Sequence, residues 1–138
     1  MKTGVLAGAV GIGALALSDR LERAWLGRAP VYAPDRISTR LFALRSRRRS
    51  RAVGAILRWS YGLVIAGAWN RLVPSRRASV RRALGLGAAI LAFEFWALPA
   101  LGATPPLRRW SRAEKALLAW HTQVFGFGEE AARRLLSM

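Results

Sequence analysis

Four ionisable side chains lie within long apolar stretches of this 138-residue sequence, one in each stretch: Asp19, Arg58, Glu94 and His121. A charge inside an apolar segment is costly unless it meets a partner, so such residues pair with one another or mark functional sites. Carboxylates and an imidazole are also the groups that hold and pass protons inside membranes. We therefore treat the four residues as a candidate buried polar layer.

The four residues lie at similar depths within their segments. Each is six to nine residues from the end of its segment on one side, which at about 1.5 Å per residue corresponds to roughly 9–14 Å from one shared boundary. Two interpretations stay open: a static layer that fixes helix register, and a proton or cation relay in which Glu94 titrates and His121 shuttles. Arg58 weighs against the relay, because a fixed positive charge beside Glu94 favours the ionised acid.

Composition indicates an integral membrane protein. The hydrophobic share is 53% and the formal net charge is +16, a combination that membrane proteins achieve by separating apolar spans from basic connections. Apolar blocks alternate here with arginine clusters. We predict one all-α transmembrane domain over residues 1–138, a four-helix bundle, with spans at about residues 4–25, 52–70, 83–101 and 113–136.

The first three segments are predicted on different grounds. The second and third are about as long as a bilayer requires, and each has one charged residue in its interior. The first also fits a cleavable signal peptide, but small residues along one helical face favour its retention as a packed helix. The glycines that we predict to pack between helices are Gly4, Gly8, Gly11, Gly54 and Gly62.

The fourth segment has a clear start and a polar end. Ser111 and Glu114 form a capping-box pattern, in which each side chain satisfies a backbone amide at the helix start. The apolar part that follows is short, so a tilted or half-inserted helix stays an alternative. Glu129 and Glu130 are predicted to pair with the arginines at i,i+4, at the membrane surface.

The connection over residues 28–51 is strongly basic and has a helical apolar period. Ile37, Leu41 and Leu44 recur at i, i+4 and i+7 between arginines, which predicts a short amphipathic interfacial helix between spans 1 and 2. Each arginine near an anionic leaflet contributes on the order of 1 kcal/mol; a dedicated protein or phosphoinositide-like site is the alternative. The predicted contacts with anionic lipid headgroups are Arg36, Arg40, Arg45, Arg47, Arg48, Arg49 and Arg51.

The distribution of basic residues predicts an orientation. Lysine and arginine number 14 on the side of the first and third connections and 8 on the other side. The positive-inside rule then makes connections 1–2 and 3–4 cytoplasmic. Because arginines of the second connection would have to cross, dual insertion stays an alternative. The arginine bias is typical of a GC-rich bacterial genome, so we predict a multi-pass protein of the bacterial inner (plasma) membrane.

Several function classes find no support in the sequence. It has no cysteine and one histidine, which excludes thiolate and histidine-rich metal sites. It has no GxSxG, P-loop or HExxH motif, and no nucleic-acid module accompanies its positive charge. We therefore expect no enzyme activity, no catalytic residue, no cofactor, no metal and no nucleic-acid partner.

The order of features resembles that of small uncharacterised bacterial inner-membrane proteins of the YagU-like kind. The resemblance implies a multi-span inner-membrane protein without a defined biochemical role, and it carries over no catalytic or binding residue. The basic run over residues 45–51 and the short fourth span depart from the pattern. The residues that carry the resemblance are a glycine-rich first span, Tyr61-Gly62, Leu98-Pro99-Ala100-Leu101-Gly102, Pro105-Pro106, and His121 followed by Gly126.

Two functions are consistent with these observations. The first is a small non-enzymatic accessory or scaffold subunit that packs against other membrane subunits or copies of itself, because glycine faces and short loops offer little else. The alternative is a small proton- or cation-coupled transporter that uses the buried layer, dimeric because four short helices enclose little space. Both functions place anionic lipids around the protein.

Overall fold

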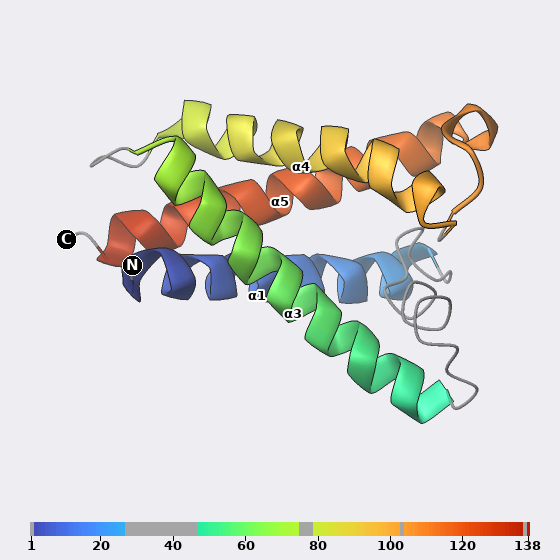
Figure 1. Ribbon diagram of the computed structural model, residues 1–138, viewed down its shortest axis with the longest axis horizontal. Coiled ribbons are helices and arrows are strands. Elements are labelled where there is room, and N and C mark those ends of the chain that lie inside the picture. Colours follow the sequence, from blue (N-terminus) through green and yellow to red (C-terminus); the bar gives the residue numbers. More distant parts are fainter. Residues whose placement is uncertain (1, 27–46, 75–78, 103, 137) are drawn as a thin grey trace.

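The computed structural model describes residues 2–26, 47–74, 79–102, 104–136 and 138 (Figure 1). Every regular element in these residues is helical and none is a strand, which confirms the predicted all-α class. The elements are α1 (Lys2–Leu26), α3 (Arg47–Leu72), α4 (Val80–Ala100), the 3₁₀ turn η1 (Leu107–Arg109) and α5 (Arg112–Leu136).

Three of the described helices are long and apolar enough to cross a membrane by length and composition. Their apolar windows are Gly4–Glu22 in α1, Ala52–Leu72 in α3 and Val80–Ala100 in α4. Among the described residues α5 does not qualify, because charged residues shorten its apolar part at both ends. The fourth predicted segment is therefore a helix, and its crossing of a membrane stays a prediction.

Local sequence signals explain where the helices begin. The capping box at α5 is confirmed: Ser111 Oγ accepts from the Glu114 amide at 3.1 Å, and the Ser111 amide donates to Glu114 Oε2 at 2.7 Å. Ser79 Oγ accepts from the Arg82 amide at 3.3 Å and caps α4, so this helix starts three residues before the predicted span. Gly102 ends it with φ 63°, a conformation that glycine adopts without steric cost.

The second helix begins inside the basic run. α3 starts at Arg47, five residues before the predicted span, because arginine is a good helix former and no glycine or proline intervenes. The side chains of Arg48 and Arg49 are exposed. The described residues do not include the predicted surface helix or Arg36, Arg40 and Arg45. The side chains of Arg47 and Arg51 also lie outside them.

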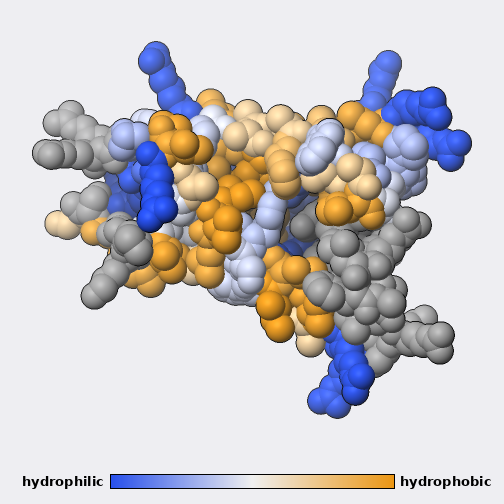
Figure 2. All heavy atoms as spheres, in the orientation of Figure 1, coloured by the Kyte–Doolittle hydropathy of each residue, from blue (hydrophilic) through white to orange (hydrophobic). Residues whose placement is uncertain are grey.

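The helices pack in a chain of neighbours with α5 flanked on two sides. α5 contacts both α1 and α4, and α1 also contacts α3, which crosses the others diagonally (Figure 1). Figure 2 shows apolar side chains over the middle of the visible face and strongly hydrophilic ones toward its ends. Two buried apolar clusters lie between the helices. One contains Ile12, Ala66, Leu86, Ile90 and Phe125, and the other contains Leu98, Trp110 and Leu118.

Glycines allow the close approach of α1 and α3. A Cβ at Gly8 would lie 2.8 Å from the Ala66 methyl group, and one at Gly62 would overlap the side chain of Ile12. Small residues at such crossings let helices pack closely in lipid. Three further predicted packing glycines are also in contact or buried: Gly4 beside Asn70, Gly11 beside Phe125, and Gly54.

The α4–α5 contact leaves no room for a side chain at Gly126. A Cβ there would contact the Ala83 carbonyl oxygen and lie 3.2 Å from the Gly87 amide nitrogen. Since both neighbours are backbone atoms, Gly126→Ala is expected to lower the free energy of unfolding by about 1–3 kcal/mol. Circular dichroism during denaturation in detergent measures it.

The matched control is Gly67→Ala in α3. A Cβ at Gly67 would meet no atom of the described chain within 4 Å, so alanine is expected to be neutral, or to stabilise the helix by about 0.5–1 kcal/mol. Equal free energies of unfolding for the two variants would contradict the close α4–α5 packing.

Candidate functional site

The four residues of the predicted polar layer, Asp19, Arg58, Glu94 and His121, line one cavity of about 30 Å³. This volume holds about two water molecules. Asp19 and His121 are 4% and 6% exposed, and Glu94 is also buried. Among the described helices, α1, α3, α4 and α5 each contribute one of these residues, so the cavity lies between these four.

Arg58 is the cation of this cavity. Its guanidinium forms an ion pair with one oxygen of the Asp19 carboxylate. The Glu94 carboxyl has Arg58 and Tyr61 as its polar neighbours. Guanidinium groups suit such positions because they stay charged when buried and present several donors. The ion pair therefore joins α1 to α3 inside the apolar core.

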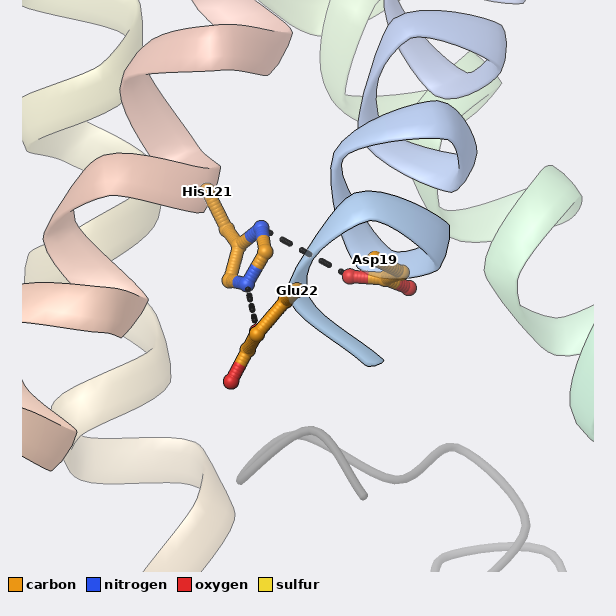
Figure 3. Close-up of side chains that lie close together, drawn as sticks. All are labelled: Asp19, Glu22 and His121. Atoms are coloured by element: carbon orange, nitrogen blue, oxygen red, sulfur yellow. Dashed lines mark hydrogen bonds and ion pairs between the residues drawn. The ribbon is translucent and has the colours of Figure 1, made fainter. Parts of the chain in front are cut away.

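Sequence reasoning left Glu22 out of the layer. Its Oε2 lies 2.6 Å from His121 Nε2, and Oδ1 of Asp19 lies 3.5 Å from Nδ1 of the same ring (Figure 3). Nε2 thus faces one carboxylate oxygen at hydrogen-bond distance, and Nδ1 faces another at a longer distance. The i,i+3 spacing of Asp19 and Glu22 was the available signal, because it places both acids on one helical face.

His121 lies between two compartments. It lines the cavity together with Asp19, and it also lines a groove of about 570 Å³ between α1 and α5 together with Glu22. Ser18 lies in this groove with its Oγ 3.2 Å from His121 Nδ1, and it accepts a hydrogen bond from Trp120 Nε1 at 3.2 Å. Nε2 of the ring therefore faces the groove carboxylate of Glu22, and Nδ1 faces both the Ser18 hydroxyl of the groove and the Asp19 carboxylate of the cavity.

The same three side chains offer a possible set of metal ligands. Asp19, Glu22 and His121 each supply one ligand atom, and these atoms lie within 4.8 Å of one another. The 2.6 Å between His121 Nε2 and Glu22 Oε2 is, however, a hydrogen-bond distance, and Arg58 already pairs with Asp19. This geometry fits an ion-pair network that holds a proton better than a metal centre.

The two acids near the end of α5 are buried within the protein. Glu129 and Glu130 are 0% and 5% exposed, and their place at the membrane surface stays a prediction. Because α5 is flanked by both α1 and α4, its last turns face protein on two sides. The charges of the two acids are therefore met inside the protein.

Arg82 of α4 is the centre of this second network, which the sequence did not predict. Its Nε donates to Glu130 Oε2 at 3.1 Å, and a terminal nitrogen donates to Asn70 Oδ1 at 2.8 Å. Asn70 in turn donates to Glu129 Oε1 at 2.8 Å, and Arg133 lies 3.6 Å from Glu130. The network links α3, α4 and α5 at the end of the molecule away from the cavity.

Comparisons with protein-family models, curated proteins and solved structures find no match to this chain. The resemblance to the YagU-like proteins therefore stays a prediction. The function has to be inferred from the geometry of the cavity and the groove.

Proposed function

We propose that this chain is a small non-enzymatic membrane transporter coupled to proton movement, in which His121 passes the proton between Glu22 and Asp19. The observation that supports it is the position of the ring between the groove and the cavity, with one nitrogen directed at a carboxylate in each. Histidines and acids inside membranes are the groups from which proton relays are built.

The distances define the order of the steps. Glu22 and His121 Nε2 are 2.6 Å apart, so a proton moves between them along an existing hydrogen bond. The 3.5 Å from Nδ1 to Asp19 is too long for a direct bond. That step uses a small shift of the ring or a water in the cavity, which has room for one.

Arg58 has to release Asp19 for the relay to continue. A guanidinium paired with Asp19 occupies one oxygen of that carboxylate. Glu94 is the other acid near Arg58, so the guanidinium keeps a partner when it turns from one acid to the other. In this mechanism the exchange of Arg58 between the two acids accompanies each proton that passes.

Proton flux into liposomes tests the proposal. The purified chain is reconstituted with an internal pH-sensitive dye, and an external acid pulse is applied. His121→Gln keeps hydrogen-bonding capacity but cannot carry the proton, so the flux is expected to fall about a hundredfold. Arg134→Gln, which changes an exposed charge of the same helix, is expected to match the unmodified protein. Wild-type flux in the His121 variant, or no flux in folded wild-type protein, would overturn the proposal.

A second candidate function is an accessory subunit, favoured by the exposure of α3. Only 17% of its apolar window is buried, against 39% for that of α4, and its outer face includes Ile56, Trp59 and Val64. Such a face accommodates another membrane helix. Copurification of a membrane subunit in mild detergent, lost on Trp59→Ala, together with absent proton flux would favour this function.

The location and lipid contacts remain part of the proposal. We place the protein in the bacterial inner membrane with connections 1–2 and 3–4 cytoplasmic, on the basis of the basic residues in those connections. Anionic headgroups are the proposed partners of the arginines near the start of α3, where Arg48 and Arg49 are exposed.

A further inference from the structure

The groove between α1 and α5 combines an apolar wall with a buried carboxylate. Leu17, Leu21, Leu117 and Val124 supply most of the wall, and Glu22 is 8% exposed. Its volume of about 570 Å³ is typical of sites for drug-sized organic molecules. A ligand of this size would be in contact with both hydrocarbon side chains and a charge.

One oxygen of Glu22 remains to be satisfied. Oε2 is taken by His121, whereas Oε1 is buried and has no hydrogen-bond partner among the described residues. A buried carboxylate oxygen without a partner is costly, and a positive charge is the group that compensates it best. The groove therefore favours a cation at its Glu22 end.

Trp120 adds a second preference for positive charge. It lines the groove, is 62% exposed and is held by its hydrogen bond to Ser18. An indole ring is the strongest cation–π partner among the side chains. Inorganic cations would make no use of the apolar wall, anions would be repelled by Glu22, and neutral acyl chains would leave Oε1 unpaired.

We propose that this groove binds lipophilic organic cations, with the charge at Glu22 and the apolar body against the leucines and Trp120. The inference rests on the proposed function, for which it names the class of transported substrate. The cation and the proton on His121 compete for the same carboxylate, because a cation at Glu22 repels the protonated ring. The other charged groups that face the ring are Asp19 on α1 and, across the cavity, Arg58 on α3 and Glu94 on α4.

Equilibrium dialysis with tetraphenylphosphonium tests the inference on the full chain in detergent. Saturable binding of one cation per chain is expected. Tetraphenylborate, which has the same shape and the opposite charge, is expected to bind at least about tenfold more weakly. Glu22→Gln keeps the size of the side chain and removes its charge, so it is expected to weaken phosphonium binding about tenfold or more.

A matched pair of exposed tryptophans serves as a control that does not depend on a buried substitution. Trp120→Leu is expected to weaken phosphonium binding several-fold. Trp96→Leu, at a residue that is 70% exposed on α4 and outside the groove, is expected to leave binding unchanged. If Glu22→Gln does not fold, the tryptophan pair and the comparison with tetraphenylborate decide whether the groove binds lipophilic cations.

Three results would overturn the inference: no saturable phosphonium binding, equal binding of tetraphenylborate, or unchanged phosphonium binding in Glu22→Gln. Unchanged binding in Glu22→Gln would identify a groove for lipid chains. Its failure is distinguishable from failure of the proposed function. Proton flux that depends on His121 without phosphonium binding would retain the relay and reject the substrate class. Phosphonium binding that depends on Glu22 without any proton flux would reject the relay and retain the binding of lipophilic cations.

Discussion

Arg58→Ala is expected to lower the free energy of unfolding by about 3–5 kcal/mol, because it leaves the Asp19 carboxylate buried without its ionic partner. The Asp19 side chain is 5% exposed and that of Arg58 is 14% exposed, so water cannot replace the guanidinium. His121 does not compensate, because its Nδ1 is 3.5 Å from the carboxylate. Denaturation in detergent, followed by circular dichroism, measures the loss.

Two further variants make the test specific. Arg48→Ala removes an exposed arginine near the start of the same helix and is expected to change stability by less than about 0.5 kcal/mol. The double variant Asp19→Asn/Arg58→Ala is expected to lose less than the sum of its single changes, because the carboxylate charge that Arg58 pairs with is removed together with the guanidinium. Additive losses, or equal losses for Arg58→Ala and Arg48→Ala, would contradict a buried ion pair.

Glu130→Ala is expected to have the second large effect, also about 3–5 kcal/mol. Arg82 is 5% exposed and would lose its carboxylate partner at 3.1 Å. The Ser79 amide, which donates to Glu130 Oε1 at 3.0 Å, would lose its acceptor at the start of α4. The same denaturation measurement applies, and hydrogen exchange at the first turn of α4 is expected to speed up.

Glu114→Ala is the matched control, because it removes a glutamate of the same helix that acts in the capping box. It is expected to cost about 0.5–2 kcal/mol, the usual value for a lost cap. If Glu130→Ala costs no more than Glu114→Ala, the second network does not hold α4 to α5.

The helices themselves follow from local sequence. The lengths of α1, α3 and α4 reflect apolar windows of about the span of a bilayer, and the start of α5 reflects the capping box at Ser111. Glycine spacing also predicted Gly8 as a packing glycine, and a Cβ there would lie 2.8 Å from the Ala66 methyl group. These features depend on neighbours in the chain, on the rise per residue and on the backbone amides of one turn, so they can be read without knowing the fold.

The candidate site was predictable only in part. The depth of Asp19, Arg58, Glu94 and His121 along their segments could be counted from the sequence because helical rise is constant. The partner of each residue could not be predicted from the sequence, since it depends on how the helices are rotated and crossed. Glu22 was missed for this reason, as it lies nearer the end of its segment and becomes buried only where α5 brings His121 against it.

The sequence by itself therefore determined that the chain forms long helices, where α5 begins, and which ionisable groups share a level. Only the tertiary structure decided that α5, which lacks an apolar window long enough to cross a membrane, packs between α1 and α4. It also decided that Glu130 meets Arg82 and Glu129 meets Asn70 inside the protein, and that one histidine separates a cavity from a groove. The reason is that burial of a helical face is a property of the neighbouring helices and not of the face itself.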